Sequence, residues 1–353
     1  MRFFYFQTLE NTKKNIRVLT KDELIQFFEQ HDMSSYRGKQ VYQWLWQKGV
    51  HDFDSMTNLP LEHRELLKAN FQINHIKIHA KQKSKDGTVK NAVQLYDQLV
   101  VESVLIPTAR RTTACVSSQV GCSLDCTFCA TASLKRIRNL NPDEIYDQVV
   151  MINQQSLAYY KRPLSNIVFM GMGEPLMNYK NVLASIDKIT DPEGLGISPK
   201  KITVSTSGIP KFIRKMADDG VKFRLAVSLH SARQEIREKI MPFATKFPLD
   251  ELLKSLQYWY ARTKNRITFE YIVWGGVNDS KLDIQALVKF CLQVPSKVNL
   301  IQYNPIDRNS MKQAPSKTIE AYMKTLVDSR IQVTYRRSRG EDIDAACGQL
   351  ANK

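Results

Sequence analysis

Apolar residues recur at helical spacing through the first part of the chain. Residues 22–30 place Leu24, Phe27 and Phe28 on one face of a predicted helix. Residues 36–48 and 61–70 predict two further helices, and the aromatic and basic side chains of the first of these could contact nucleic acid. Aromatic residues of this kind more often belong to a core, which is our interpretation of both tryptophans in that helix.

From Ile73 onward the pattern changes to alternating apolar and polar residues. The turn dipeptide Asp86-Gly87 and two apolar runs follow, which together predict a small β-meander. We expect a domain boundary near Tyr96. The chain would then consist of an accessory domain over residues 1–96 and a larger domain over residues 97–353.

Beyond Cys129 short apolar runs alternate with segments of helical period. Repeated units of this length predict an α/β fold with a parallel barrel or an open parallel barrel. Polar residues that follow the strands should meet at one end of such a barrel. The expected strands are 111–117, 166–170, 201–206, 223–229, 267–273, 297–303 and 331–336, and the helices between them begin near 142, 178, 210, 233, 281 and 316.

Composition fits an ordinary globular protein, with 43% hydrophobic and 24% charged residues among 353. No apolar run is long enough to span a bilayer, and residues 1–14 have no signal-peptide pattern. We therefore expect a cytoplasmic protein with no membrane association.

The formal net charge is +16. An excess of this size favours a polyanionic partner through counterion release. A basic surface that only maintains solubility is the alternative, and nucleic acid is the interpretation we prefer. Charge does not distinguish RNA from DNA.

Three cysteines, Cys122, Cys126 and Cys129, form a C-x3-C-x2-C run. Three thiolates on one short loop can bind three irons of a 4Fe–4S cluster and leave the fourth iron open to a ligand. Structural zinc is the alternative, but it normally takes four cysteine or histidine ligands. No histidine is near this loop, and Cys115 is the only local candidate for a fourth ligand.

Further polar motifs follow the predicted strands. The turn MGMGEP contains Gly173, which would let the backbone approach a ligand closely, and Glu174, which can accept hydrogen bonds from an ammonium group. The alternative for MGMGEP is an ordinary βα turn, and the alternative for His230 is a structural histidine. Together these motifs predict a pocket for a small zwitterionic nucleoside. The other candidates at strand ends are Ser205, Ser228, Leu229, His230 and Asn304.

Cys347 lies in the C-terminal stretch RRSRGEDIDAACGQL, between Gly340 and Gly348. This stretch could be a mobile segment that carries a reactive thiol into the pocket. An inert, buried cysteine is the alternative, and Cys291, on an apolar helix face, fits that description well.

The motifs CVSSQVGC, CTFCAT, FMGMGEPL, STSG, SLH, YNP and GEDIDAACGQLA resemble one family of radical S-adenosylmethionine (SAM) enzymes. That family methylates carbon-2 of adenine in 23S rRNA and tRNA. The resemblance covers nearly the whole chain, including YRGKQVYQWLW and DFDSMTNLP in the first 96 residues. It implies a partial (βα)6-type radical SAM barrel after a small N-terminal helical and β accessory domain that binds RNA.

The resemblance also implies two cofactors. Cys122, Cys126 and Cys129 would hold a 4Fe–4S cluster, and SAM would chelate its open iron through amino and carboxylate groups. The positions that match the SAM-binding residues of the family are Gly173, Glu174, Ser205, Ser228, Leu229, His230 and Asn304.

Three further residues match catalytic positions of the family. One SAM would methylate Cys347, and a second would be cleaved to a radical that activates this methyl group for addition to adenine. Cys115 would resolve the protein–RNA adduct and end in a disulfide with Cys347, and Glu102 would accept a proton. A thiol carrier suits carbon-2, because this electrophilic carbon does not accept a polar methyl transfer.

The implied partners are 23S rRNA, tRNA and an external one-electron donor of flavodoxin type, and we expect a monomer. A related methyltransferase that modifies carbon-8 of adenine and confers antibiotic resistance is the main alternative. A non-enzymatic RNA-binding protein with structural zinc is a third.

One departure from the family pattern is Ala132, where a glycine is common. The loop that follows contains Lys135, Arg136 and Arg138, and its charge would suit RNA phosphates.

Overall fold

The computed structural model describes residues 13–307 and 309–352, so most of the N-terminal stretch considered for a signal peptide lies outside it. The chain divides into two compact units. The first consists of the chain up to His75 together with the separate segment 191–196, and the second consists of residues 76–190 and 197–353. The expected boundary near Tyr96 differs from this division. The reason is that the predicted meander joins the large sheet instead of the helical unit.

The first unit contains the three predicted helices. The first of them begins at a capping box in which Thr20 and Glu23 bond each other's backbone N–H. Trp46 is buried in the core as expected, whereas Trp44 is partly exposed with the Lys48 ammonium 3.5 Å from its ring centroid. The elements are β1 (Lys14–Asn15), η1 (Ile16–Val18), α1 (Lys21–Glu29), α2 (Tyr36–Trp46), α3 (Leu61–Asn70) and β2 (Phe71–Gln72), with β1 and β2 parallel.

A ten-stranded sheet forms the centre of the second unit, in the order β14-β13-β12-β11-β10-β9-β6-β5-β4-β3. Strands β6 and β9 to β14 are parallel, and β5, β4 and β3 continue the sheet in antiparallel pairs. The sheet is open, because its two edges, β14 and β3, do not pair. This confirms the partial barrel. Its strands are β3 (Lys77–Lys83), β4 (Val89–Gln94), β5 (Val100–Pro107), β6 (Thr112–Cys115), β9 (Asn166–Phe169), β10 (Ile202–Thr206), β11 (Arg224–Ser228), β12 (Ile267–Ile272), β13 (Ser296–Ile301) and β14 (Gln332–Arg336).

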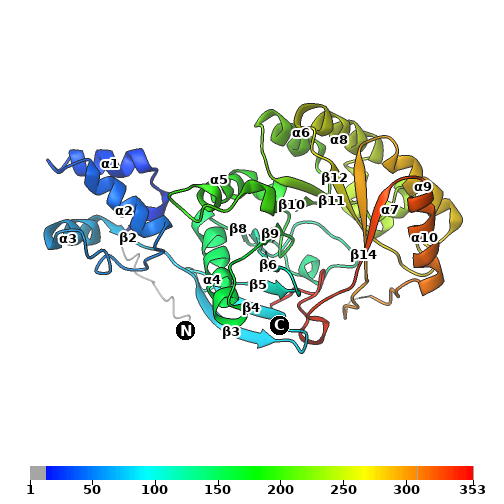
Figure 1. Cartoon of the computed structure of the whole chain (residues 1–353), viewed down its shortest axis with the longest axis horizontal. Helices are drawn as coiled ribbons and strands as arrows, with labels where there is room; N and C mark the ends of the chain where they lie inside the picture. Colours follow the sequence, from blue (N-terminus) through cyan, green and yellow to red (C-terminus); the bar gives the residue numbers. More distant parts are fainter. Residues whose placement is uncertain (1–12, 308, 353) are drawn as a thin grey trace, which may run out of the picture. The chain divides into compact units, whose positions relative to one another are not determined.

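Helices connect the parallel strands and lie along the outer side of the curved sheet (Figure 1). The sequence pattern predicted all of the longer helices in this unit except α8, which follows α7 in the same connection. None of the described helices has the length and apolar character needed to cross a bilayer. The helices are α4 (Pro142–Tyr160), α5 (Tyr179–Thr190), α6 (Pro210–Asp218), α7 (Gln234–Ile240), α8 (Leu249–Thr263), α9 (Lys281–Cys291) and α10 (Ser316–Asp328).

Short elements complete this unit. A two-stranded pair forms within the loop after β6, and short 3-10 turns occur in several of the connections. They are β7 (Gln119–Val120), β8 (Arg138–Asn139), η2 (Ala130–Ser133), η3 (Pro175–Asn178), η4 (Pro199–Lys201), η5 (Pro242–Thr245) and η6 (Glu341–Ile343).

Strand register aligns polar side chains inside the barrel. Ser228 on β11 is opposite Glu270 on β12, Glu270 is opposite Asn299 on β13, and Asn299 is opposite Thr334 on β14. Paired residues share a face, so these four side chains form a row. Asn299 donates a hydrogen bond of 2.9 Å to Glu270 and accepts one of 2.6 Å from Thr334. The barrel interior is therefore polar across these strands.

The packing of α1 against α2 predicts that Gly38 cannot be enlarged. A Cβ atom at Gly38 would lie 2.5 Å from the backbone nitrogen of Ile25, closer than non-bonded atoms approach. We expect Gly38→Ala to lower the free energy of unfolding by about 2 kcal/mol, despite the better helix propensity of alanine. Lys39→Ala, at an exposed position of the same helix, should leave stability nearly unchanged. Denaturant unfolding and hydrogen exchange of α1 and α2 measure the effect, and equal behaviour of the two variants would contradict it.

Candidate functional site

The three motif cysteines lie together at the end of β6. Cys122, Cys126 and Cys129 line one cavity of about 120 Å³, whose other walls include Gly173 and Glu174 from the turn after β9. Among the described residues, no histidine lines this cavity, so the three cysteines are its candidate metal ligands of thiol or imidazole type. The same loop packs against an apolar cluster formed by residues such as Trp274 and Tyr303, Met241 and Ile272. The donor set and the apolar surroundings fit an iron–sulfur cluster.

Within residues 13–307 and 309–352, no three His, Cys, Asp or Glu side chains converge on the position of a single metal ion. A 4Fe–4S cluster does not require such convergence, because each cysteine binds a different iron. Cys115, the only candidate for a fourth zinc ligand, lines a different cavity. The positions of these four cysteines therefore fit a three-cysteine cluster better than a closed zinc site.

Burial disfavours the charged thiolates in the cofactor-free protein. It raises the pKa of Cys122 to about 11 and the pKa of Cys126 well above its usual value. Neighbouring thiols raise both values further, whereas Arg237 lowers the pKa of Cys126. Metal binding at this loop must therefore displace protons from the cysteines.

Arg237 on α7 is completely buried and joins the ends of two strands. Its guanidinium donates hydrogen bonds to the carbonyl oxygens of Ser228 (3.0 Å), Leu229 and Ser207 (2.6 Å). Burial lowers its pKa to about 10, so the group remains charged at neutral pH. It is a fixed positive charge beside Cys126, and the sequence analysis did not identify it.

Close packing within the protein explains the two glycines of MGMGEP, in addition to the expected approach of a ligand to the backbone. A Cβ at Gly171 would lie 2.7 Å from the Ser117 hydroxyl and the Val116 carbonyl, and a Cβ at Gly173 would lie 2.5 Å from the Gln119 Cβ. Gly173 also has a φ of +94°, which few other residues adopt. Close packing against the segment after β6 thus requires these glycines, although both also line the cavities.

Glu174 is buried at the same turn, with 2% of its surface exposed. One carboxylate oxygen accepts the Leu176 N–H at 3.0 Å, and the other accepts the Ser207 N–H at 2.8 Å. Burial raises the pKa of this carboxyl, and these backbone bonds oppose the shift. The carboxylate is held in one orientation toward the cavity and can accept a further bond from a ligand ammonium group.

A second cavity, of about 140 Å³, adjoins the first. Five of the predicted nucleoside-binding residues line it, namely Gly173, Glu174, Ser205, Ser228 and His230. Two others do not. Leu229 has no exposed surface and contributes its backbone N–H to the Glu270 carbonyl, and Asn304 donates a 3.0 Å hydrogen bond to the Cys347 carbonyl. The Asn304 Oδ1 atom is buried without a hydrogen-bond partner.

His230 has a strained backbone at the wall of this cavity. Its φ is 55°, in the left-handed region that is uncommon for residues other than glycine. Nδ1 accepts the Ile272 N–H at 3.2 Å, and burial followed by the charge of Arg237 lowers the pKa to about 3. The imidazole is therefore neutral at physiological pH, with its proton on Nε2 available to a ligand acceptor.

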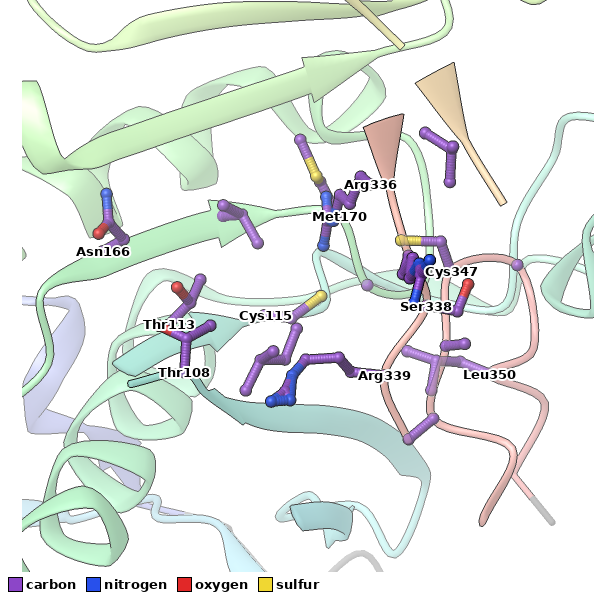
Figure 2. Close-up of a pocket in the computed structure, with 18 of the residues that line it drawn as sticks. Thr108, Thr113, Cys115, Asn166, Met170, Arg336, Ser338, Arg339, Cys347 and Leu350 are labelled. Carbon is purple, nitrogen blue, oxygen red and sulfur yellow. The ribbon is translucent and has the colours of Figure 1, made fainter. Parts of the chain in front are cut away.

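A third cavity, of about 360 Å³, is lined by two of the three catalytic candidates. Cys115 on β6 and Cys347 on the C-terminal segment line it, with Met170 and Arg336 beside them (Figure 2). Cys347 also lines the second cavity, and Cys129 lines all three. Cys347 thus lies at the wall between the second and the third of these cavities. All six cysteines are free thiols.

The segment around Cys347 is hydrogen bonded to the cysteine loop. The Ala130 N–H donates to the Gly348 carbonyl at 2.7 Å, and the Thr131 hydroxyl donates to the Leu350 carbonyl at 2.6 Å. Together with Asn304, these bonds hold Cys347 near the cavities.

Glu102 lies close to this segment but does not line any of the three cavities. It is fully buried on β5, with one carboxylate oxygen 3.2 Å from Lys90 Nζ and the other accepting the Ala351 N–H at 2.8 Å. The structure therefore places Glu102 beneath the C-terminal segment, where it helps to anchor that segment.

Glu270 and Arg336 are two of the charged residues at the cavities that the sequence analysis did not identify. Glu270 is 4% exposed and lines the second cavity, and its Oε2 atom has no hydrogen-bond partner. Arg336 lines both larger cavities, and the Cys347 and Cys115 thiols raise its pKa, with Cys347 the larger influence. The available signals were a glutamate in the apolar strand ITFEYIV and an arginine at the end of IQVTYR.

The basic loop is only partly free to bind a ligand. Ala132 lies within η2, a regular 3-10 turn. Arg138 pairs with Asp97 at 2.6 Å and with Glu144 at 2.8 Å, so this arginine stabilises the fold. Lys135 and Arg136 have no ion pair among the described residues and remain candidates for RNA contacts.

Comparison with known proteins gives consistent matches over the whole chain. A profile of the Radical SAM superfamily matches residues 116–288, and a profile of the ribosomal RNA large subunit methyltransferase N-terminal domain (RlmN_N) matches residues 14–73. A probable dual-specificity RNA methyltransferase RlmN from Christiangramia forsetii is 63% identical, with 99% of each chain covered. A dual-specificity RNA methyltransferase RlmN from Geotalea uraniireducens is 41% identical, with 97% of each covered.

A solved structure is also similar over nearly its full length. The crystal structure of a radical SAM methyltransferase from Sphaerobacter thermophilus superposes with a TM-score of 0.90 at 34% identity. The alignment covers 96% of this chain and 100% of that one.

The buried position of Arg237 predicts a large loss of stability on its removal. Arg237→Leu would leave three carbonyl oxygens without donors in a dry environment. We expect the free energy of unfolding to fall by about 3 kcal/mol. Lys239→Leu, at an exposed position of the same helix, should have little effect. Denaturant unfolding of the cofactor-free protein measures both, and equal values for the two variants would argue against this role.

Burial predicts a very slow reaction of Cys115 with alkylating reagents. Burial, and to a smaller extent Cys347, raises the pKa of the Cys115 thiol from 9.0 to about 12. At pH 8 the thiolate fraction should be about 1000-fold lower than in the unfolded chain, and labelling should rise tenfold per pH unit. The raised pKa stabilises the fold below pH 9, and this contribution is lost as the pH rises from 9.0 toward about 12. Mass spectrometry after iodoacetamide labelling of native and denatured cofactor-free protein tests this, and a labelling midpoint near pH 9 would refute it.

Proposed function

The chain belongs to the RlmN family of radical SAM RNA methyltransferases, and on this premise we propose that it methylates carbon-2 of adenine in 23S rRNA and in the anticodon loop of tRNA, with Cys347 as methyl carrier. The observation that carries the proposal is the shared cavity of Cys115 and Cys347. A carrier thiol must be joined by a second thiol that releases the product. These two cysteines provide that pair.

Two cofactors follow from this function. Cys122, Cys126 and Cys129 would hold a 4Fe–4S cluster. The adjoining cavity of about 140 Å³, here called the nucleoside cavity, would hold SAM. When bound, the cluster and SAM supply the radical that activates a methyl group. Two buried acceptors without partners, the Asn304 Oδ1 and Glu270 Oε2 atoms, suit the donors of a nucleoside. Leu229 would contribute through its backbone, because its side chain is buried.

Glu174 and His230 would orient the nucleoside cofactor. The Glu174 carboxylate, held by the N–H groups of Leu176 and Ser207, can accept a hydrogen bond from the SAM ammonium group. The neutral His230 imidazole offers an Nε2 proton to an acceptor nitrogen or oxygen. Gly173, Ser205 and Ser228 line the same cavity and would complete the contacts.

Cys347 can serve two cavities because it lies at the wall between them. Its thiolate can accept a methyl group from a sulfonium donor in the nucleoside cavity and present that methyl group to a base in the 360 Å³ cavity. The Arg336 guanidinium lines the same two cavities as Cys347. Hydrogen bonds from Ala130 and Asn304 to Gly348 and Cys347 keep the sulfur in this position.

Cys115 would release the product by attacking the Cys347 sulfur. An S–S bond forms as the S–C bond of the protein–RNA adduct breaks, and the electron pair passes to the product carbon, which takes up a proton. External reductant must then reduce the disulfide. Glu102 would accept the proton lost from the base. Its carboxylate contacts the Ala351 N–H, so this role requires a shift of the C-terminal segment.

RNA and an electron donor would be the partners of the enzyme. The net charge of +16 and the partly exposed Trp44 with its neighbouring Lys48 support RNA contacts by the accessory domain. We further propose an external one-electron donor of flavodoxin type and a cytoplasmic location, where both RNA substrates are found.

The proposed route predicts a methyl group on Cys347 before RNA is added. Anaerobically reconstituted protein incubated with SAM should show an increase of one methyl group, located at Cys347 by peptide mass spectrometry. Cys347→Ala should show none, and Cys291→Ala, which removes an unrelated buried cysteine, should keep it. An unmodified Cys347 in protein with an intact cluster would contradict the proposal.

The RNA product distinguishes carbon-2 from carbon-8 methylation. Nuclease digestion of treated tRNA and 23S rRNA should yield 2-methyladenosine, whereas 8-methyladenosine would indicate the related resistance activity. In Cys115→Ala the adduct has no resolving thiol, so protein covalently bound to RNA should accumulate. Free methylated RNA from this variant at the wild-type rate would show that Cys115 does not resolve the adduct.

A further inference from the structure

The inward-facing positions of the barrel carry positive charges at the beginnings of the strands. Ala226 on β11 is opposite Thr268 on β12, and Thr268 is opposite Lys297 on β13. Arg224 precedes Ala226 by two residues, so its side chain is on the same inward face as those of Ser228 and Glu270. The beginnings of these strands thus carry cations, whereas their ends carry the nucleoside-binding groups.

Arg111 brings a further cation to this end of the barrel. It directly precedes β6 and lines the 360 Å³ cavity together with Thr113 and Asn166. In Figure 2 Thr113 and Asn166 lie at one side of that cavity, and Cys347 lies at the other. The cavity therefore extends from the cationic end of the barrel to the carrier thiol.

These cations lack anionic partners within the described part of the chain. The side chains of Arg111, Arg224 and Lys297 form no hydrogen bond or ion pair there, whereas Arg266 donates to the Ser296 carbonyl at 2.9 Å. Burial lowers the pKa of Lys297, and the charge of Arg224 lowers it further. Arg266 and Arg111 act in the same direction, and only Glu270 opposes them. Mutual repulsion of this kind is relieved by a bound anion.

We propose that Arg111, Arg224 and Lys297 form a phosphodiester site at the beginnings of the barrel strands, which holds the RNA backbone next to the target nucleotide. The target base would leave its stack and enter the 360 Å³ cavity, a volume typical of ligand pockets. The backbone would remain at the cationic end while the base reaches Cys347. This inference rests on the proposed function and specifies the side from which RNA enters.

A salt titration of RNA binding tests the site. A transcribed stem-loop with one loop adenine is bound to the cofactor-loaded protein and to the triple variant Arg111→Gln, Arg224→Gln, Lys297→Gln. Each lost phosphate contact should reduce the slope of log affinity against log salt by about 0.7 to 0.9, so the triple variant should lose about 2.1 to 2.7. Its affinity should fall most at low salt.

A matched control separates this site from net charge. Lys289, Lys317 and Lys324 are exposed lysines on the outer helices α9 and α10. Their triple change to glutamine removes the same charge and should leave the slope within about 0.5 of wild type. A charge-conserving variant, Arg224→Lys with Lys297→Arg, should also retain the slope. Equal losses in the two triple variants, or an unchanged slope in the first, would overturn the proposal.

Two control measurements distinguish loss of the phosphodiester site from misfolding and from failure of the proposed function. Thermal unfolding shows whether the triple variant folds, and if it does not, the exposed Arg224→Gln alone should reduce the slope by about 0.8. Methylation of Cys347 in wild-type protein without RNA reports on the proposed function alone. Methylated Cys347 with an unchanged slope would refute the phosphodiester site only, whereas an unmethylated Cys347 would refute the proposed function.

Discussion

In-register parallel pairing of β6 with β9 to β14 is the constraint on which the site depends. Because of this pairing, alternate residues of neighbouring strands face the interior of the barrel. Ser228, Glu270 and Asn299 therefore form a row that is positioned by the strands alone. A shift of one residue in any strand would exchange this row for the apolar residues that pack under the helices. Chemistry and core packing are therefore determined by the same register.

The position of Cys347 results from contacts between segments far apart in sequence. The turn that follows Cys129 binds the backbone around Gly348 and Leu350, and Glu102 of β5 binds Ala351. The cysteine loop and the segment that contains Cys347 thus form one hydrogen-bonded structure. This arrangement explains how a thiol close to the C-terminus can lie between two cavities.

Much of the fold could be predicted because periodicity is local. The parallel units and the positions of the cysteine loop and MGMGEP at strand ends followed from short patterns. Properties that depend on distant partners could not be predicted. Arg138 was interpreted as a surface cation, but Asp97 and Glu144 pair with it, and Gly171 is small because Ser117 and Val116 lie against it.

At the site, too, local sequence patterns identified some residues, whereas contacts between distant segments determine others. Motif spacing indicated Cys122, Cys126 and Cys129, and family resemblance indicated Cys115 and Cys347. Arg237 and Glu270 act through three-dimensional contacts with carbonyl oxygens and a cavity, which no spacing reveals. Helix α8 shows that a connection can contain an additional element even when the strands on either side of it are predicted correctly.

Strand β3 ends the sheet with every one of its residues exposed, and three of them are the lysines Lys77, Lys81 and Lys83. An open edge offers unpaired backbone groups to any other strand and invites aggregation. A second β3 docking there would bring its own lysines against these, and their repulsion would oppose growth of the sheet from one molecule to the next. The charged border thus lets a barrel remain unclosed, as its cavity requires, without making the protein prone to self-assembly along that edge.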